Sequence, residues 1–239
     1  MRFTVLTLNL WNISEPLALR MTAFESGLKA LQPDIVCLQE VADHPQTRQR
    51  QSAIAADASG LTYAADNHQL SILSRFPIER PLSVALPRVP EDEPRQALMA
   101  DLRIDGRVLL IANTHLSWKV EWLAERKTQV DALLPAIGNR DTRDAAILCG
   151  DFNDDPDSPA LLAVAGEFTD SFAACHPKEP GLTWVRQNPY VHPLTERDQR
   201  IDYIFFTGAL TALGCRVVFN DPAALASDHF GVFATFEFG

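Results

Sequence analysis

Apolar and polar side chains alternate along the first nine residues of the chain. Phe3, Val5 and Asn9 fall on one face of an extended segment, while Leu6 and Leu8 fall on the other, because side chains alternate with period two in a strand. Both faces carry apolar groups, so the pattern predicts a strand buried between two layers that ends at Asn9.

Short apolar runs bounded by turn residues predict further strands. Asp105-Gly106 is a two-residue turn that favours a hairpin between two of them. The predicted strands span residues 35–38, 70–73, 78–86, 97–104, 108–113, 145–149, 201–206, 215–219 and 230–238.

Apolar residues at helical spacing, together with capping residues, predict helices between these strands. They span residues 16–31, 44–58 and 119–134, and a further helix opens at Ser158-Pro159. We expect Pro135 to end or kink the third helix. Strands and helices interleave with no linker or repeat, which predicts a single domain over residues 1–239. Its predicted class is α+β, with helices outside two mainly antiparallel sheets.

Composition and charge narrow the function. The chain has 239 residues, of which 46% are hydrophobic and 22% charged, as in an ordinary soluble protein. Its 21 Lys and Arg against 31 Asp and Glu give a net charge of −10. This balance argues against a broad basic surface that grips nucleic acid, and it leaves open an enzyme whose phosphate contacts are local and assisted by a metal.

Cysteine spacing and hydropathy bear on the compartment. The four cysteines lie far apart without a CxxC pair, which disfavours a zinc cluster or a disulfide framework. The first residues are too short and too alternating for a signal peptide, and no run of about 18 apolar residues occurs. We therefore expect a cytoplasmic protein without a membrane span.

Polar residues recur where the predicted strands end or begin. Each one alone has a simpler reading as a turn residue, a solvated strand end or a core histidine, but strand ends gather at the rim of a sandwich, where they can form one cleft. Carboxylate and amide oxygens suit Mg²⁺ or Mn²⁺, and imidazoles exchange protons near neutral pH. These residues are Asn9, Glu40, His115, Asp151, Asn153, Asp202, Asp228 and His229.

Seven short motifs contain or neighbour these residues. They are Thr7-Leu8-Asn9, Leu38-Gln39-Glu40-Val41, Ile72-Leu73-Ser74-Arg75-Phe76-Pro77-Ile78, Asn113-Thr114-His115-Leu116, Gly150-Asp151-Phe152-Asn153, Arg200-Ile201-Asp202-Tyr203-Ile204 and Ser227-Asp228-His229. In this order the motifs resemble the endonuclease/exonuclease/phosphatase superfamily. The resemblance covers the chain nearly end to end and implies a four-layered α/β/β/α sandwich of the DNase I-like type.

The resemblance also implies a metal cofactor. By this likeness Asn9, Glu40 and Asp228 hold a divalent cation, Mg²⁺ with Mn²⁺ as the alternative, and Glu40 is the first ligand to expect. The pattern fits one metal or two equally well. Crowded carboxylates repel one another without a cation, so metal binding is expected to stabilise the fold.

Catalytic roles follow from the same resemblance. Asp151 and Asn153 are expected to orient the attacking water and bind a phosphate oxygen, or to help hold a second metal. His229, paired with Asp202, is expected to do acid–base or phosphate-stabilising work, and His115 to donate to the scissile phosphate.

Substrate contacts are expected from three further residues. The His115 motif and the segment Gly181-Leu182-Thr183-Trp184 resemble the sphingomyelinase, deadenylase and tyrosyl-DNA phosphodiesterase side of the superfamily. Trp184 could stack on a base or an aromatic leaving group, and Arg95 and Arg200 could bind phosphate. The alternatives are a tryptophan that anchors a loop and solvated surface arginines.

The resulting hypothesis is a Mg²⁺-dependent phosphodiesterase, expected to be a monomer, that acts on nucleic acid or a nucleotide-type phosphodiester. The alternative is hydrolysis of a phospholipid or a small phosphorylated metabolite. A catalytically silent binding module is disfavoured, because no residue of the predicted site is missing from the sequence.

Overall fold

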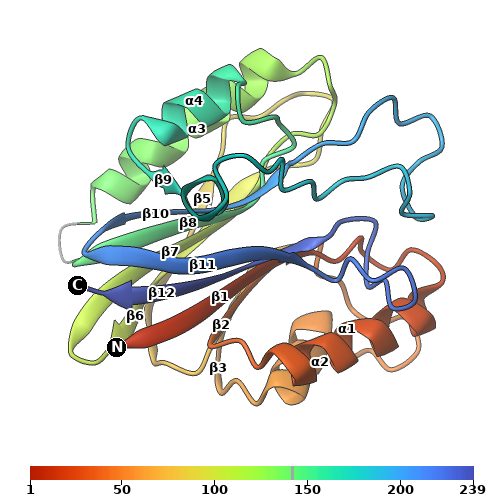
Figure 1. The fold of residues 1–239 in the computed structure, drawn as a ribbon, viewed down its shortest axis with the longest axis horizontal. Helices are drawn as coiled ribbons and strands as arrows, with labels where there is room; N and C mark the ends of the chain where they lie inside the picture. Colours follow the sequence, from red (N-terminus) through yellow and green to blue (C-terminus); the bar gives the residue numbers. More distant parts are fainter. Residues whose placement is uncertain (141–142) are drawn as a thin grey trace.

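Two six-stranded sheets lie face to face, and each carries helices on its outer face (Figure 1). The computed structural model describes residues 1–140 and 143–239. The first sheet has the order β11 (Leu210–Val218), β12 (Gly231–Phe238), β1 (Arg2–Asn9), β2 (Ile35–Gln39), β4 (Ser71–Ser74) and β3 (Tyr63–Asp66). The second has the order β5 (Ile78–Ala85), β6 (Gln96–Ile104), β7 (Arg107–His115), β8 (Ala145–Asp151), β10 (Asp202–Gly208) and β9 (Thr169–Asp170).

Each sheet contains one parallel pair, β1 with β2 and β7 with β8, and its other pairs are antiparallel. Helices α1 (Leu17–Leu31) and α2 (Gln51–Ser59) cover the first sheet, while α3 (Leu123–Gly138) and α4 (Pro159–Ala165) cover the second (Figure 1). A short helix, α5 (Ser171–Cys175), follows β9. The predicted four-layered sandwich with two mainly antiparallel sheets is confirmed.

The period-two pattern of the strands decides what lies between the sheets. Phe3 and Val5 of β1 pack in the core between the two sheets, whereas Leu6 and Leu8 pack under the helices on the outer face. Continuing that alternation places Asn9 on the inner face, where it is buried. The inward positions of several strands therefore end in polar residues at the same open end of the sandwich.

Two predicted helices begin later than the sequence pattern suggested. Residues 44–49 form a turn, closed by a bridge between Asp43 and Arg50, so α2 begins at Gln51. The guanidinium of Arg50 donates to the carbonyls of Asn67 and His68 (2.6 and 3.0 Å) and ties this turn to the next loop.

Helix α3 begins at Leu123 instead of residue 119, because the carbonyls of Ser117 and Lys119 accept hydrogen bonds from the Arg126 side chain. Pro135 does not end this helix, which continues to Gly138 and closes with a bond from Asn139 N to the Pro135 carbonyl (2.9 Å). Strand β3 was not predicted. Within the described residues, no helix has the length and apolar character needed to cross a membrane.

Candidate active site

Strand register places Asp151 at the centre of the site. Asp151 is the last residue of β8, and its partner across the antiparallel pair is Asp202, the first residue of β10. On the other side, the parallel pair of β7 and β8 sets His115 beside Asp151. Three residues that are distant in the sequence are therefore brought together by the sheet itself.

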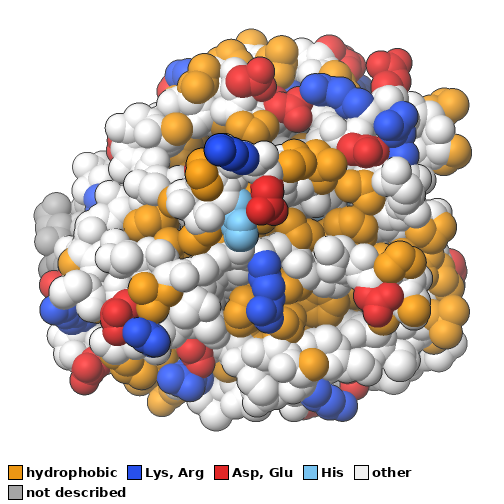
Figure 2. All heavy atoms as spheres, in the orientation of Figure 1, with side chains coloured by type: hydrophobic (Ala, Val, Ile, Leu, Met, Phe, Trp, Pro, Cys, Tyr) orange, Lys and Arg blue, Asp and Glu red, His pale blue; other side chains and the backbone are white. Residues whose placement is uncertain are grey.

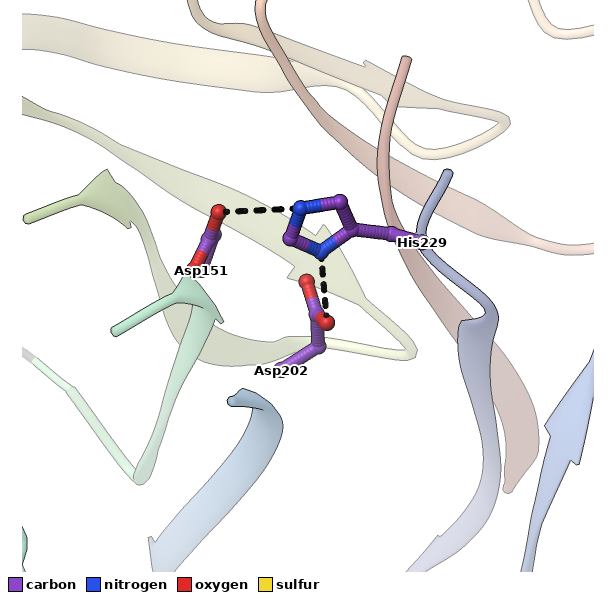
Figure 3. Close-up of side chains that lie close together, drawn as sticks. All are labelled: Asp151, Asp202 and His229. Carbon is purple, nitrogen blue, oxygen red and sulfur yellow. Dashed lines mark hydrogen bonds and ion pairs between the residues drawn. The ribbon is translucent and has the colours of Figure 1, made fainter. Parts of the chain in front are cut away.

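His229 lies between the two aspartates (Figure 3). Its Nδ1 is 2.9 Å from Oδ2 of Asp202, and its Nε2 is 3.7 Å from Oδ2 of Asp151. The backbone N–H groups of Ile201 and Asp202 donate to Oγ1 of Thr183, which fixes the start of β10. All three members of this group are buried, so Asp202 holds the imidazole with Nε2 directed at Asp151.

The charges of this group shift its pKa values. Burial lowers the pKa of His229, but the carboxylates of Asp202 and Asp151 outweigh it and raise the pKa well above its usual value. Burial, reinforced by Asp202, raises the pKa of Asp151 to about 7, although His229 and the amide of Asn9 oppose the shift. An aspartate that takes up a proton near neutral pH beside a cationic imidazole is suited to acid–base chemistry.

His115 approaches the same carboxylate from β7. Its Nε2 lies 3.4 Å from Oδ2 of Asp151, and its buried Nδ1 has no hydrogen-bond partner among the described residues. Burial first, and then the positive charges of Arg95 and His229, lower the pKa of His115 well below its usual value. His115 is therefore a neutral imidazole with one ring nitrogen that can donate to a bound group.

Further polar side chains lie beside this group, at the ends of β1 and β2 and in the loop before β12. Asn9 Nδ2 donates to Oε1 of Glu40 (3.1 Å) and to Oδ2 of Asp151 (2.9 Å), and Asn9 Oδ1 accepts from Trp11 N (2.9 Å). Burial and the negative charge of Glu40 raise the pKa of Asp228 to about 6. Two neighbouring carboxylates, one of them desolvated, form a set of hard oxygen donors that fits a divalent cation.

Asn153 closes the site on the far side of Asp151. Its backbone N–H donates to Oδ1 of Asp151 (2.9 Å), and its Nδ2 donates to the carbonyl of Leu116 (3.1 Å). Its positive φ of 52° turns the chain back after β8. Asn153 therefore orients the Asp151 carboxylate and links it to the loop that follows β7.

Gly150 allows these strands to approach. Its φ is +135°, and a Cβ at this position would lie 2.0 Å from the carbonyl oxygen of Thr114 on β7. Only glycine has both the conformation and the space that the site requires here.

A cleft of about 1090 Å³ opens over this group. Of the predicted residues, Glu40, His115, Asp151, Asn153, Asp228 and His229 line it, together with Arg95 and Trp184. The Trp184 ring contacts the ring of His229 edge-on, with centroids 4.8 Å apart.

Arg200 is placed differently from Arg95 and Trp184. It is not among the described residues that line the cleft; it pairs with Asp170 (2.9 Å), and its guanidinium lies over the rings of Phe172 and Tyr203. Its contacts therefore give no support to the expectation that it binds substrate phosphate.

Two buried arginines that support the site were not predicted. Arg20 of α1 donates to the carbonyls of Leu10 and Ala226 (2.7 and 3.1 Å), and Arg126 of α3 donates to Asp154 (3.0 Å). A signal was present in the sequence, because each arginine lies three or four residues from apolar positions on the buried face of its helix.

A cluster of carboxylates and imidazoles lies at the open end of the four-layered fold. A family model, described as the endonuclease/exonuclease/phosphatase family, matches residues 6–229. The chain belongs to this family, as its motifs suggested.

Individual relatives agree on the fold. TDP2 from Caenorhabditis elegans superposes with a TM-score of 0.79 at 21% identity, covering 100% of this chain and 76% of that one. The human Nocturnin catalytic domain, with a bound sulfate anion, gives 0.77 at 20% identity, covering 100% and 95%. An endonuclease/exonuclease/phosphatase protein from Bacteroides vulgatus gives 0.82 at 18% identity, covering 100% of both chains.

One curated protein matches in sequence over a shorter stretch. Uncharacterized protein F14F9.5 of Caenorhabditis elegans is 34% identical over 89 residues, which are 30% of this chain and 28% of that protein. The chain therefore matches less than a third of the length of this relative.

Proposed function

We propose that this protein is a divalent-metal-dependent hydrolase of phosphodiesters, and that nucleic acid or nucleotide-type phosphodiesters are the substrate class to test first. The observation that carries the proposal is the array in which Asp202 holds His229 with its Nε2 towards Asp151, beside the carboxylates of Glu40 and Asp228. Family membership supports the same chemistry.

Glu40 and Asp228, with Asn9, are the residues that would hold Mg²⁺ or Mn²⁺. Asn9 Oδ1 already accepts one hydrogen bond, from Trp11 N, and has a second lone pair for a cation. When bound, the ion would neutralise charge on the phosphate and on these carboxylates and polarise a phosphorus–oxygen bond.

Four side chains of the protein provide the proton transfer and the contacts to the phosphate oxygens. Asp151, fixed by Asn9 and by Asn153 N, accepts a proton from the attacking water, and the Asn153 side chain contacts a phosphate oxygen. His229, held cationic by Asp202, donates to the developing negative charge through Nε2. His115 donates to a second phosphate oxygen and does not add charge of its own. Positioned donors of this kind act where charge builds up in the transition state.

Hydrolysis by metal-free protein with Mg²⁺, Mn²⁺ or excess chelator tests the proposal. The substrates are single-stranded, duplex and 5′-adduct DNA, the p-nitrophenyl ester of thymidine 5′-monophosphate, sphingomyelin and phosphoinositides. We expect metal-dependent hydrolysis of at least one phosphodiester, abolished in Glu40→Gln and in His229→Ala. Activity that persists in both variants identifies a contaminating nuclease, and full activity in excess chelator refutes the metal role.

A second candidate is hydrolysis of a phospholipid or a small phosphorylated metabolite. The exposed side chains of Trp118 and Val120, on the loop between β7 and α3, favour it because they present apolar surface to the cleft. Faster turnover of sphingomyelin or phosphoinositides than of the thymidine ester would select this candidate.

A further inference from the structure

The arginines of the cleft are already neutralised by carboxylates. Within residues 1–140 and 143–239, three arginines line the cleft. Arg95 makes a two-pronged pair with Asp92, in which both N–O distances are 2.9 Å, and the two side chains are almost fully buried. Arg197, whose side chain is exposed, pairs with Asp155 through one guanidinium nitrogen.

Arg126 and Lys119 also have acidic partners. Arg126 pairs with Asp154 (3.0 Å) while it donates to backbone carbonyls of the loop before α3. Lys119 on that loop has its Nζ 3.9 Å from Glu91 and 4.5 Å from the centre of the Trp122 ring. In the described part of the cleft, no arginine is left to bind a second phosphate without breaking an ion pair.

Acidic side chains outnumber these cations. Among the residues that the structure describes, nine carboxylate residues line the cleft against the three arginines, and Glu93, Asp157 and Glu196 are exposed to solvent at its rim. On the face shown in Figure 2, Lys and Arg side chains are scattered among Asp and Glu and do not gather into a patch. A divalent cation would offset two of these charges and leave the rim negative.

Apolar side chains occupy other parts of the rim. Trp118, Val120 and Leu123 are 57%, 76% and 44% exposed, and they stand on the loop and first residue that connect β7 to α3. Leu194, on the loop between residues 186 and 199, is 80% exposed and lines the same cleft. Exposed apolar groups that converge on one cleft mark a binding surface.

From these two features we infer that the substrate carries a single phosphate and an uncharged, apolar arm, and is not a polynucleotide. This inference rests on the proposed hydrolysis of phosphodiesters and narrows its substrate class from nucleic acid or nucleotide-type esters to esters with one phosphate. The reacting phosphate would be neutralised by the cation that Glu40 and Asp228 would hold and by His229, whereas each further phosphate would meet carboxylates and paired arginines. The apolar rim instead offers contact area to an arm without charge.

A matched pair of substrates tests whether phosphates beyond the reacting one disfavour hydrolysis. The p-nitrophenyl ester of thymidine 5′-monophosphate and the 5′-p-nitrophenyl ester of decathymidylate share the reacting bond, and release of nitrophenolate reports only that bond. We expect kcat/KM for the nucleotide to exceed that for the oligomer by about tenfold or more at low salt, because like charges disfavour the longer substrate. Added salt should narrow the gap by screening the repulsion.

Charge-neutralising variants sharpen this test. Asp155→Asn and Asp92→Asn free Arg197 and Arg95, so each should raise kcat/KM for the oligomer by about threefold or more while the nucleotide ester changes less than about twofold. Asp155→Asn changes an ion pair in which Arg197 is exposed, so the test remains valid even if Asp92→Asn, which changes a buried pair, does not fold. Asp105→Asn, at the remote turn between β6 and β7, removes the same charge and should leave both rates unchanged.

A second pair of substrates tests whether the apolar rim contacts an uncharged arm of the substrate. Trp118→Ala and Leu194→Ala should raise KM for bis(p-nitrophenyl) phosphate with kcat unchanged, and leave KM for methyl p-nitrophenyl phosphate as it was. Leu162→Ala, on the exposed face of α4 outside the cleft, is the matched control.

The outcomes distinguish a failure of the single-phosphate inference from a failure of the proposed function. An oligomer hydrolysed as fast as the nucleotide, with a rate that falls as salt rises, overturns the single-phosphate inference and leaves the proposed function standing. Equal effects of Trp118→Ala on the aryl and methyl esters overturn the apolar part. If the metal-loaded protein hydrolyses neither these esters nor any DNA or phospholipid substrate named above, the proposed function itself fails.

Discussion

His229 and Asp202 form a buried pair, with 2.9 Å between the imidazole Nδ1 and the carboxylate Oδ2, although 27 residues separate them in the chain. His229 lies in the loop that leads into β12 of one sheet, and Asp202 opens β10 in the other. The pair therefore spans the two layers of the sandwich at its open end. Its charge sets the protonation of the imidazole that faces Asp151.

Asp202→Asn tests this relationship. The substitution keeps the shape of the side chain but removes the negative charge that raises the pKa of His229. We expect kcat/KM to fall by about 10²–10⁴-fold, the range of a lost acid–base contribution. Thermal unfolding should show that the variant is folded, and ¹⁵N chemical shifts should show that His229 has lost its cationic form at neutral pH. An unchanged ¹⁵N spectrum together with full activity would remove Asp202 from the mechanism.

Metal binding should stabilise the protein. Burial, together with the negative charge of Glu40, raises the pKa of Asp228, so a cation held by these two carboxylates relieves an unfavourable arrangement. At a metal concentration of about 100 times Kd, linkage predicts about 2.7 kcal/mol of stabilisation, or about 5–10 °C in Tm for a chain of this size. Differential scanning calorimetry with Mg²⁺, Mn²⁺ and chelator measures it. Glu40→Gln should lose most of the shift, and an equal shift in that variant would place the cation elsewhere.

The sequence predicts most of the fold because its strands carry strong alternation. Leu6 and Leu8 pack under the helices while Val5 faces the other sheet, and this phase carries Asn9 to the inner face. Apolar runs also locate the strand that ends at Asp151. Strand β3 escapes prediction because three of its four residues are exposed and it has no apolar run.

Contacts between distant side chains are what the sequence does not predict. The pattern around residue 44 does not predict the turn of residues 44–49, because this turn is held by the bridge from Asp43 to Arg50 and by hydrogen bonds from Arg50 to the carbonyls of Asn67 and His68. The ion pair that keeps Arg200 on Asp170 is also set by tertiary packing. Positions at strand ends predict the candidate residues of the site, whereas tertiary packing determines which of these residues contact one another.

Gly150→Ala should damage both stability and activity. The new Cβ would lie 2.0 Å from the Thr114 carbonyl oxygen, at a φ of +135° that an L side chain rarely adopts. Overpacking and backbone strain together predict a loss of about 3 kcal/mol or more in the free energy of unfolding. Urea denaturation measures it. Gly138→Ala, at the end of α3 with open space around its Cα and no positive φ, is the matched control and should be neutral or slightly stabilising. Similar losses in both variants would show that crowding at β7 is not the cause.

The pair of Arg126 and Asp154 should hold the loop before α3 in place. Both side chains are buried, and the guanidinium joins the Asp154 carboxylate to the carbonyls of Ser117 and Lys119. Arg126→Met leaves a buried carboxylate and two carbonyls without their donor. Removing one partner of such a pair predicts a loss of about 3–5 kcal/mol in the free energy of unfolding.

The double variant Arg126→Met, Asp154→Asn separates charge from packing. It removes the uncompensated carboxylate and should recover part of the stability, because much of the cost of the single variant is the unpaired charge. Arg126→Lys keeps the charge, but its single ammonium group cannot reach the Asp154 carboxylate and both carbonyls at once, so its stability should fall between those of the wild type and Arg126→Met. Chemical denaturation of the wild type, Arg126→Met, Asp154→Asn and the double variant gives the coupling energy. If Arg126→Met and the double variant are equally unstable, the guanidinium acts through its backbone contacts and the ion pair with Asp154 contributes nothing.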